Sequence, residues 1–99
     1  ETIIRETEEE TGYHLHKVKK IFQAYMSPGA VTEIIHFFIG EYDDEMKKGK
    51  GGGLASENEN IEVLEMPFET AYNMIASGEI VDGKTIMLLQ YAKINQLIN

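Results

Sequence analysis

The chain has 99 residues, too few for more than one ordinary domain. Its 17 acidic residues outnumber 9 basic ones, and the resulting net charge of −8 argues against nucleic acid as a partner, because phosphate binding needs a basic surface. The absence of Cys excludes disulfides, thiolate zinc sites and cysteine nucleophiles, and every apolar run is far shorter than the roughly 20 residues of a membrane span. We therefore expect a soluble, cytoplasmic protein with neither a membrane nor a nucleic acid as its partner.

The first half of the chain predicts a helix followed by two strands. Residues 1–11 carry one less polar stripe at helical spacing and end at Gly12, a residue type that commonly terminates helices. Partial alternation over 14–25 and a β-branched, aromatic run over 31–42 predict strands. Pro28 and Gly29 favour a turn between these strands, so we expect them to pair antiparallel.

The second half predicts a long loop, a strand and two helices. Residues 43–60 are poor in apolar side chains and rich in glycine, which predicts a flexible loop, whereas residues 61–66 alternate like a strand. Pro67 begins a predicted helix over 68–77 that ends at Gly78, and Asp82 caps a predicted helix through about Leu97. Because an acidic helix at residue 1 has nothing before it to pack against, we also expect further residues before Glu1 in the natural protein.

Three glutamates in the first predicted helix share one face. Glu6, Glu9 and Glu10 stand at i, i+3 and i+4, so their like charges repel and weaken the helix. A hard cation such as Mg²⁺, which takes oxygen ligands, would turn that repulsion into coordination. The alternative is an acidic helix face exposed to solvent, with Arg5 simply pairing with Glu9 at i+4.

The stretch from Arg5 to Tyr13 resembles the second half of the Nudix box, whose tail reads R-E-U-x-E-E-x-G-U with U an apolar residue. Thr7 departs from this pattern because it is polar. Pro28, Glu33 and the block from Gly51 to Val63 resemble the ADP-ribose and nucleotide-sugar branch of the Nudix hydrolases, and the likeness spans nearly the whole chain. It implies an α/β (α+β) fold, the Nudix α/β/α sandwich around a mixed sheet. Residues 1–99 would form the C-terminal portion of a single such domain, with the N-terminal part missing.

The resemblance also implies an activity and a site. The activity is Mg²⁺-dependent hydrolysis of the diphosphate linkage of a nucleotide sugar, and the succession of motifs is most similar to members that split GDP-mannose into GMP and mannose 1-phosphate. Alternatives are ADP-ribose hydrolysis and a non-catalytic module that binds a nucleotide sugar. Members of this branch commonly form homodimers. By similarity the metal ligands are Glu6, Glu9 and Glu10.

Catalytic and substrate-binding roles follow from the same resemblance. The general base is expected on the loop, with Glu57 favoured and Glu59 metal-linked or orienting, although their order stays open; Glu6 is a further ligand or positions water. Substrate contacts are expected from Tyr25, Ser27 and Glu33. Without the resemblance, residues 57–60 are an ordinary polar turn and Tyr25 is a packing residue.

Overall fold

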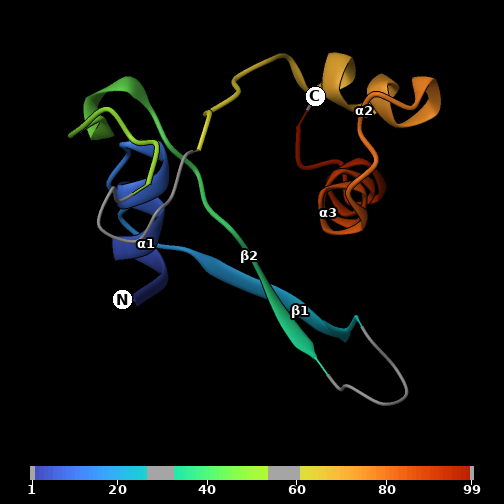
Figure 1. The fold of residues 1–99 in the computed structure, drawn as a ribbon, viewed down its shortest axis with the longest axis horizontal. Helices are drawn as coiled ribbons and strands as arrows, with labels where there is room; N and C mark the ends of the chain where they lie inside the picture. Colours follow the sequence, from blue (N-terminus) through green and yellow to red (C-terminus); the bar gives the residue numbers. More distant parts are fainter. Residues whose placement is uncertain (1, 27–32, 54–60, 99) are drawn as a thin grey trace. The chain divides into compact units, whose positions relative to one another are not determined.

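The computed structural model describes residues 2–26, 33–53 and 61–98 and divides into two units, Glu1–Val63 and Leu64–Asn99. Within these ranges it combines three α-helices with an antiparallel sheet, and the helices are segregated from the strands along the chain, so the predicted α+β class is confirmed (Figure 1). Among the described residues the sheet has two strands. The elements are α1 (Thr2–Thr11), β1 (Lys19–Tyr25), β2 (Ile34–Ile39), the 3-10 turn η1 (Asp44–Met46), α2 (Phe68–Ser77) and α3 (Gly83–Ile94).

Strands β1 and β2 pair antiparallel, as the turn residues between them predicted. Tyr25 lies opposite Ile34 at the end of the hairpin, and the register shifts between Lys20 and Phe22. Such a bulge interrupts the alternation of faces, so Ile21 and Phe22, adjacent in sequence, are both half-buried.

The core of the first unit is aromatic and small. The rings of Phe22 and Phe37 lie 4.6 Å apart across the two strands, and Phe37 is only 3% exposed. Tyr13 and Leu15 complete the buried apolar set of the described residues. Burial of these side chains in the hairpin and in the segment after α1 supplies apolar area that stabilises the first unit.

Three strand predictions differ from the structure. Strand β2 ends at Ile39 rather than at Tyr42. The first strand begins at Lys19 rather than at His14, because residues 13–15 serve other contacts: Tyr13 and Leu15 are buried, and Tyr13 forms an isolated antiparallel bridge with Lys47. Residues 61–66 form no strand; Leu64 is 67% exposed. Alternation is necessary for a half-buried strand, but a strand also needs a neighbour to pair with, and in the described part of the chain this segment has none.

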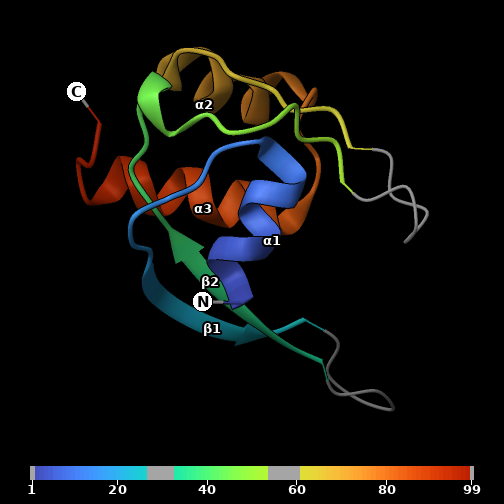
Figure 2. The ribbon, with the colours of Figure 1, turned by 90° about the vertical axis from the view of Figure 1, so that its left-hand side faces the viewer.

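The second unit is a pair of helices whose boundaries follow their caps. Helix α2 begins after Pro67, which occupies the N-cap rather than the first helical position, and ends at Gly78. Helix α2 lies beside α3 (Figure 2). Lys93 of α3 donates a hydrogen bond of 3.0 Å to Glu69, and its Nζ lies 5.1 Å from the ring centroid of Tyr72. Helix α3 ends at Ile94, three residues before the predicted end. None of the helices in the described ranges has the length and apolar character that a membrane span requires.

Asp82 caps α3 as predicted, and its removal is expected to destabilise the second unit. Its carboxylate accepts hydrogen bonds from the backbone amide of Thr85 (2.9 Å) and from Lys84 (3.2 Å). These contacts, the Thr85 amide first, hold the pKa of the Asp82 carboxyl below its usual value of 3.8. A lowered pKa means that the stabilisation is present above the ordinary pKa and is lost as the pH falls through the lowered one.

We therefore expect Asp82→Ala to lower the thermal midpoint by a few degrees at neutral pH, and less at a pH below the lowered pKa. Asp82→Asn keeps a side-chain acceptor and should keep most of the cap while losing this pH dependence. Thermal unfolding followed by circular dichroism at both pH values checks this. Equal midpoints for the Ala and Asn variants at neutral pH would contradict it.

Candidate functional site at the end of helix α1

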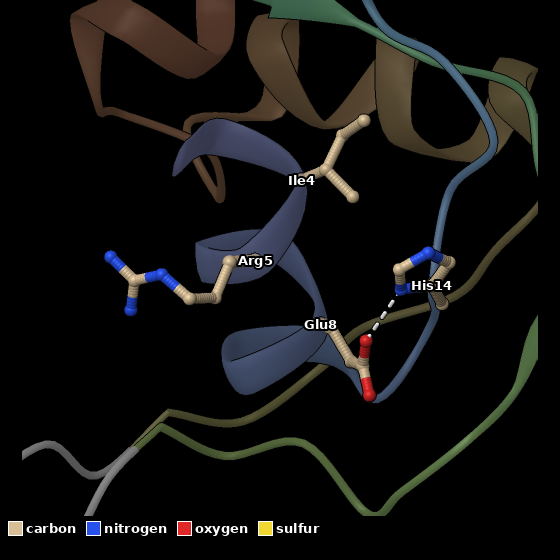
Figure 3. A pocket seen from close by; sticks show the side chains of 4 residues that line it. All are labelled: Ile4, Arg5, Glu8 and His14. Atoms are coloured by element: carbon tan, nitrogen blue, oxygen red, sulfur yellow. Dashed lines mark hydrogen bonds and ion pairs between the residues drawn. The ribbon is translucent and has the colours of Figure 1, made fainter. Parts of the chain in front are cut away.

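Two side-chain pairs, Glu8 with His14 and Arg5 with Glu9, form on the surface of α1. On one face, His14 Nδ1 lies 2.7 Å from Glu8 Oε1, and Ile4, Arg5, Glu8 and His14 line a shallow pocket. Figure 3 shows the side chains of Glu8 and His14 pointing toward each other while Arg5 points away from them. Arg5 instead pairs with Glu9, Nη1 to Oε2, at 2.9 Å. The i+4 ion pair expected from the spacing is therefore present.

The threonines of α1 satisfy their own hydroxyls. Thr7 Oγ1 donates to the carbonyl of Ile3, and Thr11 Oγ1 donates to the carbonyl of Thr7, each at 2.7 Å. Both side chains are half-buried. Because each hydroxyl bonds to the carbonyl four residues earlier, a polar residue is accommodated at position 7, where the resemblance expects an apolar one.

The last turn of α1 is capped by a segment forty residues further along the chain. The carbonyls of a helix's final turn have no partner within the helix. Here the amide of Gly12 donates to the carbonyl of Glu8 at 2.8 Å, that of Gly53 to the carbonyl of Glu9 at 3.0 Å, and that of Gly52 to the carbonyl of Glu10 at 2.7 Å. In Figure 1 the yellow-green segment accordingly lies beside the end of α1. Glu9 and Glu10, whose carbonyls have these distant partners, are two of the three predicted metal ligands.

The chain between η1 and this cap is fixed against the residues that follow α1. The amides of Lys48 and Gly49 both donate to the carbonyl of Gly12, at 2.7 and 3.1 Å. The ring of Tyr13 meets that of Tyr42 edge-on at 4.7 Å, and Lys47 Nζ lies 5.1 Å from the Tyr13 ring centroid. Residues 46–53 were predicted as part of a flexible loop, yet backbone and ring contacts hold them in place.

Glu57 and Glu59 lie outside the described residues, but both flanks of their segment are described. Gly53 donates to Glu9 as above, and the amide of Ile61 donates to the carbonyl of Gly52 at 2.8 Å. The two residues that flank this segment, Gly53 and Ile61, therefore both lie at the C-terminal end of α1.

The donor chemistry of Glu6, Glu9 and Glu10 suits Mg²⁺, which prefers carboxylate oxygens. These acids gather toward the helix C-terminus, where the helix dipole already disfavours negative charge, so a cation there would relieve two unfavourable terms. The side chains do not converge in this arrangement: within the described residues no three His, Asp or Glu side chains are placed to hold a metal ion, and Glu9 is turned toward Arg5. Metal binding at this face would need the side chains of these glutamates to move toward one another.

The predicted substrate contacts are found at the other end of the first unit. Tyr25 is 65% exposed at the end of β1, and the carbonyl of Glu33 accepts a hydrogen bond from the amide of Met26 at 2.9 Å. Ser27 lies outside the described residues. The hairpin leads away from α1 in Figure 1, so the structure brings Tyr25 and Glu33 together but not with the glutamates of α1.

Known proteins are similar to this chain over nearly its whole length. No protein-family model matches the chain. It is 55% identical over 97 residues to proteins named GDP-mannose pyrophosphatase from Shigella dysenteriae serotype 1 (strain Sd197) and Escherichia coli O157:H7, and 54% identical to the one from Escherichia coli O1:K1 / APEC. These matches cover 98% of this chain and 50% of each relative, so the chain spans about half the length of the curated relatives it matches. The similarity that the motifs indicated, to bacterial sugar-nucleotide pyrophosphatases of this kind, is confirmed.

Proposed function

We propose that this chain is the C-terminal portion of a single Nudix hydrolase domain whose full-length protein splits GDP-mannose into GMP and mannose 1-phosphate. The observation that carries this proposal is the 55% identity to GDP-mannose pyrophosphatases over 98% of the chain. It is supported by an acidic helix whose last turn, bearing Glu9 and Glu10, is hydrogen-bonded to the flank of a glutamate-containing loop.

The proposed general base is Glu57, with Glu59 as a metal-linked or orienting residue. Glu57 is four residues from Gly53 and four from Ile61. The flank residues Gly53 and Ile61 both lie at the C-terminal end of α1, which supports a role for Glu57 in a reaction beside that helix.

The reaction adds one water across a phosphoanhydride. The water oxygen attacks one phosphorus, the bond from that phosphorus to the bridging oxygen breaks, and the bridging oxygen leaves with the other phosphate. A carboxylate base accepts the proton that the attacking water loses. Glu6, Glu9 and Glu10 would hold Mg²⁺, which supplies charge neutralisation for a diphosphate that the carboxylates alone would repel. Arg5 Nη1 pairs with Oε2 of Glu9 and so holds this carboxylate in place on the helix.

Further parts of the proposal concern recognition, assembly and location. Tyr25, Ser27 and Glu33 are proposed to contact the base or sugar, and the full-length protein is proposed to act as a homodimer in the cytoplasm. The exposed end of the hairpin, with Tyr25 at 65% and Ile34 at 41%, offers side chains for contact with a substrate or a second subunit.

The test is turnover by the full-length protein. We expect GDP-mannose and Mg²⁺ to yield GMP and mannose 1-phosphate in equal amounts, and chelation of the metal to stop the reaction. Phosphorus NMR detects both phosphomonoesters directly. A higher kcat/KM for ADP-ribose would replace the substrate but keep the reaction, whereas a folded protein inert toward both would overturn the proposal.

A further inference from the structure

Glycine residues far apart in the sequence meet at the end of α1. Gly51, Gly52 and Gly53, which we call the glycine cap, reach the last turn of the helix through the amides of Gly52 and Gly53. Helices usually end with local partners or water for these carbonyls. A cap supplied from forty residues away instead ties the last turn of α1 to a second segment of the unit.

Only glycine permits the approach at one position of this cap. Gly51 has φ +76°, and a Cβ there would lie 2.6 Å from the carbonyl carbon of Thr11 and 2.8 Å from the carbonyl oxygen of Glu10. Both are backbone atoms, which cannot rotate out of the way. At Gly52, also with positive φ (+95°), a Cβ would meet only the carbonyl oxygen of Ile61, at 3.4 Å. The contact with α1 therefore depends on Gly51 in particular.

The carbonyls held by the cap belong to Glu9 and Glu10. Their side chains project from a turn that like-charge repulsion and the helix dipole both destabilise. Hydrogen bonds to the two carbonyls keep this turn helical, so the carboxylates have only side-chain torsions left to search before they can share a ligand.

We propose that Gly51 is a positioning residue, which fixes the backbone of Glu9 and Glu10 through the glycine cap and so prepares these carboxylates to bind a divalent cation. This inference rests on the proposed function, since the role of the two glutamates belongs to it. It adds a requirement that the metal-ligand assignment alone does not contain: binding of the cation and closure of the cap must be thermodynamically linked.

Linkage makes the proposal testable without any substitution. If the cap favours cation binding, the cation must in turn stabilise the cap by the same factor. We expect amide hydrogen exchange of Gly52 and Gly53 in the full-length protein, followed by NMR, to slow by about tenfold or more on addition of saturating Mg²⁺. Unchanged exchange at both amides in an enzyme whose turnover requires Mg²⁺ would overturn the proposal.

Matched glycine variants test the role of Gly51 itself. Gly51→Ala should raise the Mg²⁺ concentration for half-maximal activity about tenfold or more and speed metal-free exchange at Gly52 and Gly53. Gly52→Ala carries similar φ strain without the backbone clash and should change both quantities much less. Equal effects of the two variants would overturn the proposal, and if Gly51→Ala does not fold, the wild-type exchange experiment decides. Slowed exchange in a protein without turnover would refute the proposed function while leaving the cap intact.

Discussion

Replacing Glu10 by Gln in the full-length protein is expected to lower kcat/KM on the order of 10²- to 10³-fold, the cost of removing one preorganised charge-stabilising group. The same change also removes one member of a like-charge pair within the helix. Glu10 stands four residues after Glu6, and a like-charge pair at this spacing destabilises a helix by roughly 0.2–0.5 kcal/mol. Activity that falls while the thermal midpoint holds or rises is what a functional carboxylate predicts. Steady-state kinetics and thermal unfolding of one preparation measure both.

Glu8 provides the matched control for this experiment. It lies in the same turn, but its carboxylate lies 2.7 Å from His14 Nδ1, on the face away from the three predicted ligands. Glu8→Gln removes one negative charge and keeps an oxygen that can bond to the imidazole, so kcat/KM should stay near wild type. Equal losses for Glu8→Gln and Glu10→Gln would reduce the effect to the net charge of the helix, and a fully active Glu10→Gln would remove Glu10 from the metal site.

Elements with strong local end signals could be predicted from the sequence. Gly12, Gly78 and Asp82 act within a few residues of themselves, through backbone conformation or a side-chain cap, and the helix ends they mark are those observed at Thr11, Ser77 and Gly83. The hairpin between β1 and β2 was predictable for the same reason, since its turn residues lie between its strands.

Features that depend on distant partners could not be predicted. Residues 61–66 have the alternation of a strand, but a sequence pattern does not reveal whether a neighbouring strand is available. Likewise, the run Gly51–Gly53 indicates flexibility when considered alone. Its function as a helix cap follows only from the close approach of Gly51 to Thr11 and Glu10, forty residues away. The sequence shows both the acidic helix and the run Gly51–Gly53, but their spacing along the chain does not indicate that they are in contact.

The candidate site likewise has features that the sequence predicts and features that depend on partners the sequence does not reveal. Helical periodicity suffices to place Glu6, Glu9 and Glu10 on one face, and the i+4 spacing suffices to pair Arg5 with Glu9. Periodicity does not predict how their side chains point: among the described residues no three His, Asp or Glu side chains are placed to hold a metal ion. A side chain's direction is decided by competing partners, and the cation that would compete with Arg5 is not part of the sequence.

Replacing Glu57 by Gln should lower kcat by about 10²- to 10⁴-fold, the usual contribution of a positioned general base. A glutamine cannot accept the proton of the attacking water, so the acid limb of the pH profile of kcat should flatten as well. Glu59→Gln should lower activity less and preserve that limb. Initial rates over a range of pH with saturating GDP-mannose and Mg²⁺ distinguish these outcomes.

The pH profile is needed because a loss of rate alone does not identify the general base. A glutamate that only orients the loop or the metal can lower kcat equally far, yet the ionisation that controls the rate then still belongs to another group. If Glu59→Gln, rather than Glu57→Gln, flattens the limb, the two roles are exchanged. If neither variant does, the proton leaves through a residue outside the segment between Gly53 and Ile61, and the anchoring of both flanks at the end of α1 has no part in proton transfer.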